Sequence, residues 1–368
     1  MKFNVGALRL AADFARSERL AAANELVRHT LARNGLLSID YDRQEGPAQP
    51  EMPLVDALLA RVGSPGKAKS ADAQLPDGAE FRADVFACSA GSRAYRSYVP
   101  STATAGIEGM VVMLHGCTQN PEDFATGTGM NTLAEMHRFV IVYPHQSRGE
   151  NAQSCWNWFR RGDQGRDRGE PAILAGIARK HIAEFGIPPG RTFVAGLSAG
   201  AAMAVILGET YPDVFSAVGA HSGLPFGVAK DVPSAFEAMA GRGARTTAGR
   251  AATPVPTIVF HGSADATVHT SNADRIAQAV IDRAGDVTIN TGTQSNMSGR
   301  RVHRTITTTA EGVPVLEQWR IDGLGHAWSG GKREGSYTDP AGPDASAEMI
   351  RFFRETTGRN SQAYDVET

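Results

Sequence analysis

Short apolar runs that alternate with helical stretches constrain this chain more than any other feature of its sequence. The apolar runs lie at 110–114, 139–143, 192–195 and 256–260. Stretches with helical patterning separate or flank them, at 129–138, 170–185 and 199–210. Short buried strands that alternate with helices are typical of a parallel sheet covered by helices. The sequence therefore predicts the α/β class, with a mostly parallel sheet.

Further strands are expected on either side of this core. Residues 92–99 alternate between polar and apolar and predict a strand. The segments 302–309 and 313–321 flank Glu311-Gly312, which predicts a hairpin, or two adjacent strands, at the sheet edge. Residues 344–355 predict a closing helix.

The N-terminal region differs from the rest of the chain. Residues 5–34 predict an amphipathic helix or hairpin, and several prolines and glycines between 41 and 80 predict a linker. We expect an N-terminal helical extension and linker over 1–80, a catalytic domain over 81–358 and a flexible tail over 359–368. The extension packs on the main body or, as an alternative, forms a homodimer contact.

Composition excludes several classes of function. Lys plus Arg is 37 and Asp plus Glu is 39, so the net charge of −2 gives no electrostatic case for nucleic acid. No apolar run is long enough for a membrane span. Arg9, Asp13 and Arg16 interrupt any signal-peptide core, so a cytoplasmic location is the default expectation. A chain whose leader was removed, secreted or periplasmic, would look the same.

The segment G-L-S-A-G at 196–200 carries the clearest chemical signal. It follows the strand at 192–195 and precedes the helix at 199–210. Glycines at both ends let the chain turn sharply from strand into helix, which lifts the Ser198 hydroxyl out of the sheet. The sequence predicts that Ser198 is a nucleophile, and a glycine-rich turn without catalysis is the alternative.

A serine nucleophile needs a base, and the base needs an orienting acid. In this type of site the chain order is serine, acid, histidine, each on a loop after a strand. The strand at 256–260 leads to Asp265, and the strand that ends at Ile321 leads to His326. We predict Asp265 as the acid and His326 as the base. Weaker candidates are Asp213, Asp322, His221, His261, His269 and His303.

Acyl transfer also requires donors for the developing oxyanion. One donor is expected from Ala199, the residue after the nucleophile, and the other from the loop L-H-G-C-T-Q-N at 114–120. The backbone N–H of Cys117 is the best candidate in that loop. Cys117 either forms a disulfide with Cys155 or both remain free thiols, and Cys88 is expected to be buried and alone.

Tryptophans cluster near these segments. Trp156 and Trp158 lie in C-W-N-W-F, and Trp328 lies two residues after His326. All three are candidate substrate contacts, with simple packing of the loops as the alternative. The sequence lacks H-E-x-x-H, C-x-x-C, a P-loop and a strand-borne G-x-G-x-x-G, so we expect no metal and no nucleotide cofactor.

Taken together, an ordered set of motifs resembles the poly(3-hydroxybutyrate) depolymerase family of esterases, a branch of the α/β-hydrolases related to feruloyl and acetylxylan esterases. The motifs are S-R-A-Y-R-S-Y-V-P, L-H-G-C-T-Q-N, Y-P-H-Q, C-W-N-W-F, G-L-S-A-G, H-G-S-A-D, G-H-A-W-S-G-G and Y-T-D-P-A-G-P-D-A-S. The resemblance covers roughly residues 90–356. It implies an α/β-hydrolase fold and the triad of Ser198, Asp265 and His326.

The resemblance implies a serine esterase that acts on hydroxyalkanoate esters or oligomers through an acyl-enzyme. Within the same enzyme class, a feruloyl- or acetylxylan-type esterase is the alternative. An alternative of another class is a non-catalytic binding protein built on a hydrolase scaffold. The expected partner is therefore an ester, whether small molecule, oligomer or polyester.

Overall fold

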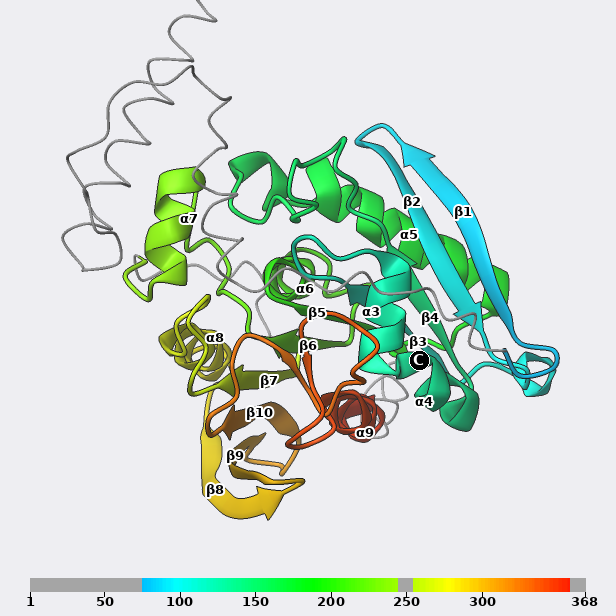
Figure 1. The fold of residues 1–368 in the computed structure, drawn as a ribbon. Coiled ribbons are helices and arrows are strands. Elements are labelled where there is room, and N and C mark those ends of the chain that lie inside the picture. The colour runs from blue at the N-terminus through cyan, green and yellow to red at the C-terminus, as the bar shows by residue number, and fades with distance from the viewer. Residues whose placement is uncertain (1–74, 244–253, 358–368) are drawn as a thin grey trace, which may run out of the picture. The chain divides into compact units, whose positions relative to one another are not determined.

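The computed structural model describes residues 75–243 and 254–357 of the chain (Figure 1). The expected N-terminal helices, most of the linker and the tail lie outside the described residues, as does the homodimer contact expected there. The boundaries at 80 and 358 therefore stay predictions.

Ten strands form one sheet within the described residues, in the order β1-β2-β4-β3-β5-β6-β7-β10-β9-β8. The strands are β1 (Glu80–Cys88), β2 (Gly91–Val99), β3 (Gly109–Leu114), β4 (Phe139–Pro144), β5 (Thr192–Leu197), β6 (Ala217–His221), β7 (Thr257–Gly262), β8 (Val287–Met297), β9 (Arg300–Thr309) and β10 (Pro314–Ile321). From β4 to β10 neighbouring strands are parallel, and the outer pairs are antiparallel. The predicted class, an α/β fold built on a largely parallel sheet, is confirmed.

The C-terminal strands occupy different places from those expected. β9 and β10 form the predicted antiparallel pair, but β10 also pairs in parallel with β7 and so lies inside the sheet. The edge position predicted for this pair is wrong, because β8 continues the sheet beyond β9. β8 is largely polar and has no apolar run, so its sequence gives little strand signal.

Helices cover both faces of the sheet (Figure 1). The described helices of at least eight residues are α3 (Pro121–Thr128), α4 (Met130–His137), α5 (Gly169–Phe185), α6 (Ala199–Thr210), α7 (Val232–Met239), α8 (Ser271–Ile281) and α9 (Ala345–Thr357). Apolar residues of α5, α6, α7 and α8 belong to one buried cluster, and those of α3, α4 and α9 belong to another. The three predicted helices of the core and the closing helix correspond to α4, α5, α6 and α9.

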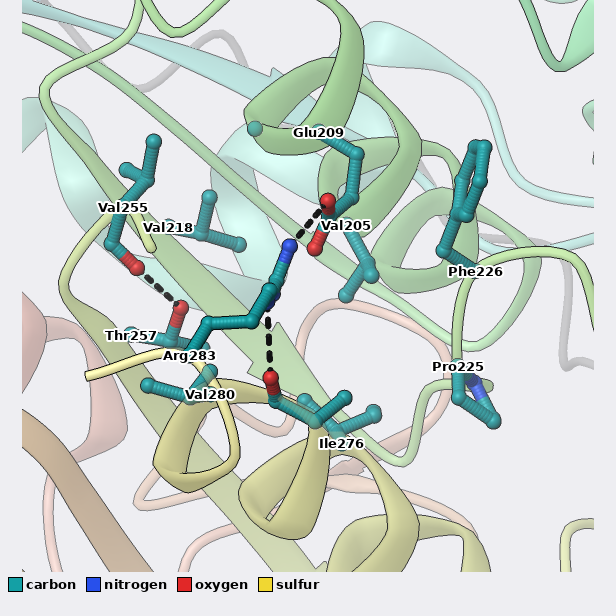
Figure 2. Close-up of a pocket in the computed structure, with 12 residues that line it drawn as sticks. Val205, Glu209, Val218, Pro225, Phe226, Val255, Thr257, Ile276, Val280 and Arg283 are labelled. Atoms are coloured by element: carbon teal, nitrogen blue, oxygen red, sulfur yellow. Dashed lines mark hydrogen bonds and ion pairs between the residues drawn. The ribbon is translucent and has the colours of Figure 1, made fainter. Parts of the chain in front are cut away.

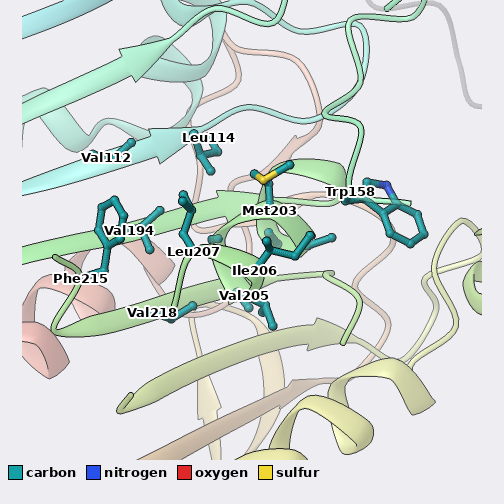
Figure 3. Packing of buried hydrophobic residues seen from close by; sticks show 14 of the residues in the cluster. Val112, Leu114, Trp158, Val194, Met203, Val205, Ile206, Leu207, Phe215 and Val218 are labelled. Atoms are coloured by element: carbon teal, nitrogen blue, oxygen red, sulfur yellow. The ribbon is translucent and has the colours of Figure 1, made fainter. Parts of the chain in front are cut away.

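Strand β3 shows how its sequence supplies both clusters. Met110, Val112 and Leu114 belong to the cluster with α5 and α6, whereas Val111 and Met113 belong to the opposite one. Successive side chains of a strand point to opposite faces, so an unbroken apolar run is needed where both faces are covered. Figure 3 shows the first of these clusters, with Leu114 near Met203 of α6.

A small pocket lies on this face between α6 and α8 (Figure 2). Val205, Val218, Ile276 and Val280 are among its apolar lining residues, and an ion pair between Arg283 and Glu209 lies at its wall. The pocket is lined by Thr257, the first residue of β7. Pro225 and Phe226, from the segment that follows β6, also line it.

The turn from β5 into α6 depends on two glycines. A Cβ atom on Gly200 would lie 2.0 Å from the carbonyl oxygen of Leu114, and one on Gly196 would lie 2.5 Å from the carbonyl carbon of Gly200. No side chain fits at such distances. The absence of side chains lets α6 start directly against the end of β3.

His221, the last residue of β6, is fully buried beside the cluster that includes residues of α3, α4 and α9. Its ring stacks between Phe260 and Trp328, with ring centroids 5.7 and 5.2 Å away, and Nε2 accepts a hydrogen bond from the backbone N–H of Ser329 at 3.1 Å. Burial lowers the pKa of His221 to about 3. The ring is therefore neutral and structural.

None of the helices in residues 75–243 and 254–357 combines the length and apolar character needed to cross a bilayer.

The glycine contact gives a stability prediction. We expect Gly200→Ala to lower the free energy of unfolding by about 3 kcal/mol or more, because overpacking against backbone cannot be relieved by a rotamer change. Chemical denaturation would measure the loss. Gly162→Ala is the control, since that Cβ would meet no atom within 4 Å. Equal stability of Gly200→Ala and the wild type would contradict the close approach.

The buried imidazole gives a pH prediction. An unfolded histidine titrates near pH 6.5, so below that pH the unfolded chain binds a proton that folded His221 does not. This group therefore makes the free energy of unfolding fall as pH drops from 6.5 toward 3, by at most about 1.4 kcal/mol per pH unit.

The variant His221→Gln, whose amide oxygen can still accept the Ser329 N–H, should show a shallower loss over this range. Urea unfolding between pH 7.5 and 4.5 would measure the difference. Other titrating groups are common to both proteins, so an unchanged slope would contradict a neutral buried imidazole.

Candidate active site

The predicted nucleophile, acid and base follow three strands of the parallel part of the sheet. Ser198 comes directly after β5, Asp265 comes three residues after β7, and His326 comes five residues after β10. These strands are parallel members of one sheet, so their carboxyl ends lie at the same edge. The fold therefore brings loops from distant parts of the sequence to one region.

Ser198 has a strained backbone. Its φ is 57° and its ψ is −118°, a region that side chains rarely adopt. Its N–H donates to the carbonyl oxygen of His221 at 2.9 Å, which holds the strained turn in place. Such strain costs on the order of 1–3 kcal/mol and is concentrated at functional sites. This conformation is that of the sharp strand-to-helix turn expected from G-L-S-A-G.

Asp265 has its side chain fully buried and both carboxylate oxygens occupied. Oδ1 accepts the backbone N–H groups of Thr267 and Val268 at 2.9 and 2.8 Å. Oδ2 lies 2.8 Å from His326 Nδ1 and 3.4 Å from His261 Nε2. Burial alone would raise the pKa of Asp265, but the two neighbouring histidines and the backbone N–H groups hold it well below its usual range. The acid is therefore an anion.

The bond to Asp265 fixes the orientation of His326. Because the carboxylate can only accept, Nδ1 of His326 carries the proton, and Nε2 is left with a free lone pair when the ring is neutral. Among the described residues, the Ser198 hydroxyl makes no hydrogen bond with His326. The structure thus joins the acid and the base, and places the serine on the same edge without a bond to them. Such contacts often tighten only when substrate binds.

The loop after β3 lies against the Ser198 turn. A Cβ on Gly200 would lie 2.6 Å from the carbonyl oxygen of His115, which places His115 beside the first turn of α6. The N–H of Gly116 is already used, since it donates to Gln119 Oε1 at 2.9 Å. The N–H groups of Cys117 and Ala199 donate to no group of the described residues. Both are available for an oxyanion.

A disulfide between Cys117 and Cys155 links this loop to the tryptophan-bearing segment. The bridge spans 38 residues of sequence, so it fastens the segment at 155–159 to the loop at 114–120. Cys88 is exposed, and the prediction that it is buried is wrong. It lies on the edge strand β1, whose side chains are mostly exposed, a property that a short mixed strand does not reveal in sequence.

The His115 ring fixes the loop at 114–120 through two hydrogen bonds. Its Nδ1 donates to the carbonyl oxygen of Gly116 at 2.7 Å, and its Nε2 accepts the N–H of Gln146 at 3.1 Å. Complete burial lowers the pKa of His115 to about 4, so the ring is neutral and can serve as both donor and acceptor. This role of His115 is not evident from the sequence. The L-H-G pattern marks the loop but not the ring's partners.

The three tryptophans predicted as substrate contacts are all buried. Trp156 is fully buried and donates its indole N–H to the carbonyl oxygen of His115 at 3.0 Å. Trp328 is 1% exposed, donates to Ser346 Oγ and stacks on His221. Both rings pack in the interior, so their contact with substrate stays a prediction. Trp158 is 6% exposed and packs edge-on against Phe159, so its contact with substrate stays a prediction.

The weaker acid and base candidates have other partners. Asp213 pairs with Arg166, and the exposed side chains of His303 and Asp322 lie 3.8 Å apart. His269 bonds to Ser271 Oγ. His261 Nε2 lies 3.4 Å from Asp265 and donates its proton to the carbonyl oxygen of Val268 at 2.8 Å, so it bonds to the loop that carries the acid. None of these contacts forms a second acid–base pair beside Ser198.

No group of three or more His, Cys, Asp or Glu side chains in the described parts of the chain could hold a metal ion. What the site offers is a strained serine, an oriented histidine beside a buried anion, and two unused backbone donors. This set can carry out nucleophilic substitution at a carbonyl carbon.

Comparisons with known proteins agree on the family. The poly(3-hydroxyalkanoate) depolymerase C of Paucimonas lemoignei is 34% identical over 257 residues, which are 66% of this chain and 60% of the relative. The poly(3-hydroxybutyrate) depolymerase of Ralstonia pickettii is 28% identical over 248 residues, 62% of this chain and 50% of the relative. The chain thus spans about half to three fifths of the length of these relatives.

A solved structure supports the fold. The acetyl xylan esterase from Aspergillus awamori superposes with a TM-score of 0.55 at 20% identity, covering 71% of this chain and 94% of that one. Together with the strand order and the turn at Ser198, this similarity identifies an α/β-hydrolase fold. The family model described as Esterase PHB depolymerase matches residues 93–302, more than half of the sequence. The chain therefore belongs to the PHB depolymerase family of esterases.

Proposed function

We propose that the chain is a serine esterase that hydrolyses carboxylic esters through an acyl-enzyme, with Ser198, Asp265 and His326 as its triad. The observation that carries the proposal is the strained Ser198 turn on the same sheet edge as the Asp265–His326 hydrogen bond. The family membership and the names of the curated relatives support the same reaction class.

In the proposed reaction, His326 Nε2 takes the hydroxyl proton as Ser198 Oγ attacks the ester carbonyl carbon. The carbonyl oxygen becomes an oxyanion, which the N–H groups of Cys117 and Ala199 stabilise. The C–O bond to the alcohol then breaks, and His326 gives the proton to the leaving oxygen. Water, deprotonated by His326, attacks the acyl-enzyme, and collapse releases the carboxylic acid and restores the serine.

Asp265 supports both steps through charge and orientation. Its carboxylate fixes Nδ1–H of His326, so Nε2 faces the reaction, and it stabilises the imidazolium that forms. Two backbone N–H groups hold the carboxylate itself. A geometry that is already assembled loses little free energy to reorganisation during the reaction.

For the substrate, we propose hydroxyalkanoate esters or oligomers of the polyhydroxybutyrate type. The support is that two relatives are named as depolymerases of such polyesters. An acetylxylan-type esterase is the second candidate, since relatives named acetylxylan esterase A also match, at 28% identity for the Aspergillus oryzae protein. Trp158 is our candidate substrate contact, because the disulfide fastens its segment to the oxyanion loop.

For the location, we propose a compartment that lets the Cys117–Cys155 bridge persist, such as the periplasm or the exterior. Disulfides are rare in reducing cytosol, so this bridge favours that alternative over the cytoplasmic one.

The nucleophile can be tested directly. Ser198→Ala should lower kcat on p-nitrophenyl butyrate by three or more orders of magnitude, because no other group supplies the attacking oxygen. Ser89→Ala, which changes an exposed turn residue, is the control and should keep full activity. A fluorophosphonate should label the wild type at Ser198. A protein that neither reacts with the probe nor turns over esters would instead be a non-catalytic binding protein.

Substrate class requires a separate comparison. We expect kcat/KM on oligomers of 3-hydroxybutyrate to exceed that on acetylated xylo-oligosaccharides and on methyl ferulate by tenfold or more. Titration of the acid that is released would measure the hydrolysis of all three substrates in the same way. Preference for the acetylated sugars would instead support the acetylxylan-type assignment.

A further inference from the structure

A buried acid lies behind the oxyanion loop and has no part in the proposed reaction. Glu170, in the first turn of α5, is 4% exposed. Its Oε1 accepts hydrogen bonds from the side-chain amides of Gln146 and Asn157 at 2.6 and 2.7 Å, and its Oε2 accepts the backbone N–H of Asn157 at 2.8 Å. The carboxylate thus binds two separate segments, one after β4 and one after the disulfide.

Gln146 connects this carboxylate to the first end of the oxyanion loop. Its backbone N–H donates to Nε2 of His115 at 3.1 Å, and its side-chain amide donates to the carbonyl oxygen of Cys155 at 3.0 Å as well as to Glu170. The orientation of Gln146 therefore sets the position of the His115 ring. That ring in turn bonds to the carbonyl oxygen of Gly116.

The second segment connects Glu170 to the other end of the loop. Asn157 follows Cys155 and Trp156 in sequence. Cys155 is bonded to Cys117, and the indole N–H of Trp156 donates to the carbonyl oxygen of His115. Both segments that Glu170 holds thus make contact with the stretch from His115 to Cys117, whose last N–H is the proposed oxyanion donor.

The charge makes a role in packing alone a poor explanation. Arg93 Nη2 lies 3.7 Å from Oε1, and Asp163 accepts the backbone N–H of Glu170 at 2.8 Å. Burial raises the pKa of Glu170 to about 7, so a carboxylate at this place is costly. An apolar side chain would fill the same volume without that cost. What it could not do is accept three hydrogen bonds at once.

We propose that Glu170 is a positioning residue for the oxyanion hole, which acts by holding Gln146 and Asn157 so that the Cys117 N–H points at the reacting carbonyl. The inference rests on the proposed function, because it assigns Glu170 to that same site. It concerns a residue that touches neither the substrate nor the triad.

The test uses two substitutions along this path. Glu170→Gln replaces one acceptor oxygen with an N–H₂ group that faces donors, and Gln146→Leu removes the side-chain link while keeping its backbone N–H. Each should lower kcat on p-nitrophenyl butyrate by tenfold or more and change KM by less than twofold, because the oxyanion donor acts in the transition state. The kcat of the double variant should be no lower than that of the less active single variant.

The matched control is Glu135→Gln. Glu135, on α4, also accepts three hydrogen bonds from uncharged donors, the Tyr98 hydroxyl and the backbone and side chain of Ser101, but it lies in a helix of the opposite layer. Its loss should lower the melting temperature without changing kcat. Melting temperatures of all variants, together with thiol titration to verify the disulfide, separate misfolding from misplacement.

The outcomes distinguish the two proposals. Wild-type-like kcat in Glu170→Gln and Gln146→Leu, in an enzyme that reacts with a fluorophosphonate at Ser198, overturns the positioning role and leaves the esterase proposal intact. A rise in KM at constant kcat, fully multiplicative losses in the double variant, or an equal kcat loss in Glu135→Gln also overturns it. If the wild type neither reacts nor hydrolyses esters, the proposed function fails and this inference fails with it.

Discussion

The close approach of α6 to the end of β3 is the constraint on which the rest of the site depends. Leu114 and His115 present their carbonyl oxygens to the backbone at Gly200, so the helix can begin only where no side chain intervenes. This contact sets the height of Ser198 above the sheet and puts the N–H of Ala199 beside the loop that contains Cys117. Backbone packing therefore positions the proposed nucleophile against the loop that contains one of the proposed oxyanion donors.

Around that contact, buried polar groups fix the conformation of loops that contain no helix or strand. Asp265 is fixed by two backbone N–H groups, and the loop after β3 is fixed by the His115 ring and a disulfide. Fully satisfied buried polar groups specify one arrangement, because any alternative leaves a donor or acceptor unpaired. Hydrogen bonds and a disulfide, and not apolar packing alone, thus hold these loops.

The central sheet and the three triad candidates could be predicted because their signals are local. Buried parallel strands require apolar runs, and a glycine on each side of Ser198 marks the sharp turn. The edge strands β1 and β8 could not be found this way, since exposed strands carry mixed sequences. Neither could the burial of Trp156 and Trp328, because their indole partners, His115 and Ser346, are distant in sequence.

Glu170 shows a different limit of sequence reasoning. An acidic residue in the first turn of a helix is common, because it interacts favourably with the helix dipole. Only the structure reveals that this carboxylate faces inward and accepts three hydrogen bonds. Local sequence rules identify where chemistry takes place more readily than they identify which residues hold that place in position.

The positive φ of Ser198 has an evolutionary consequence. A glycine would adopt this conformation without strain, so the folded protein would gain stability by discarding its hydroxyl. Selection for stability alone would therefore favour glycine at this position, whereas the proposed esterase activity requires serine. At Ser198, the stability that glycine would add is given up for the hydroxyl that the proposed reaction needs.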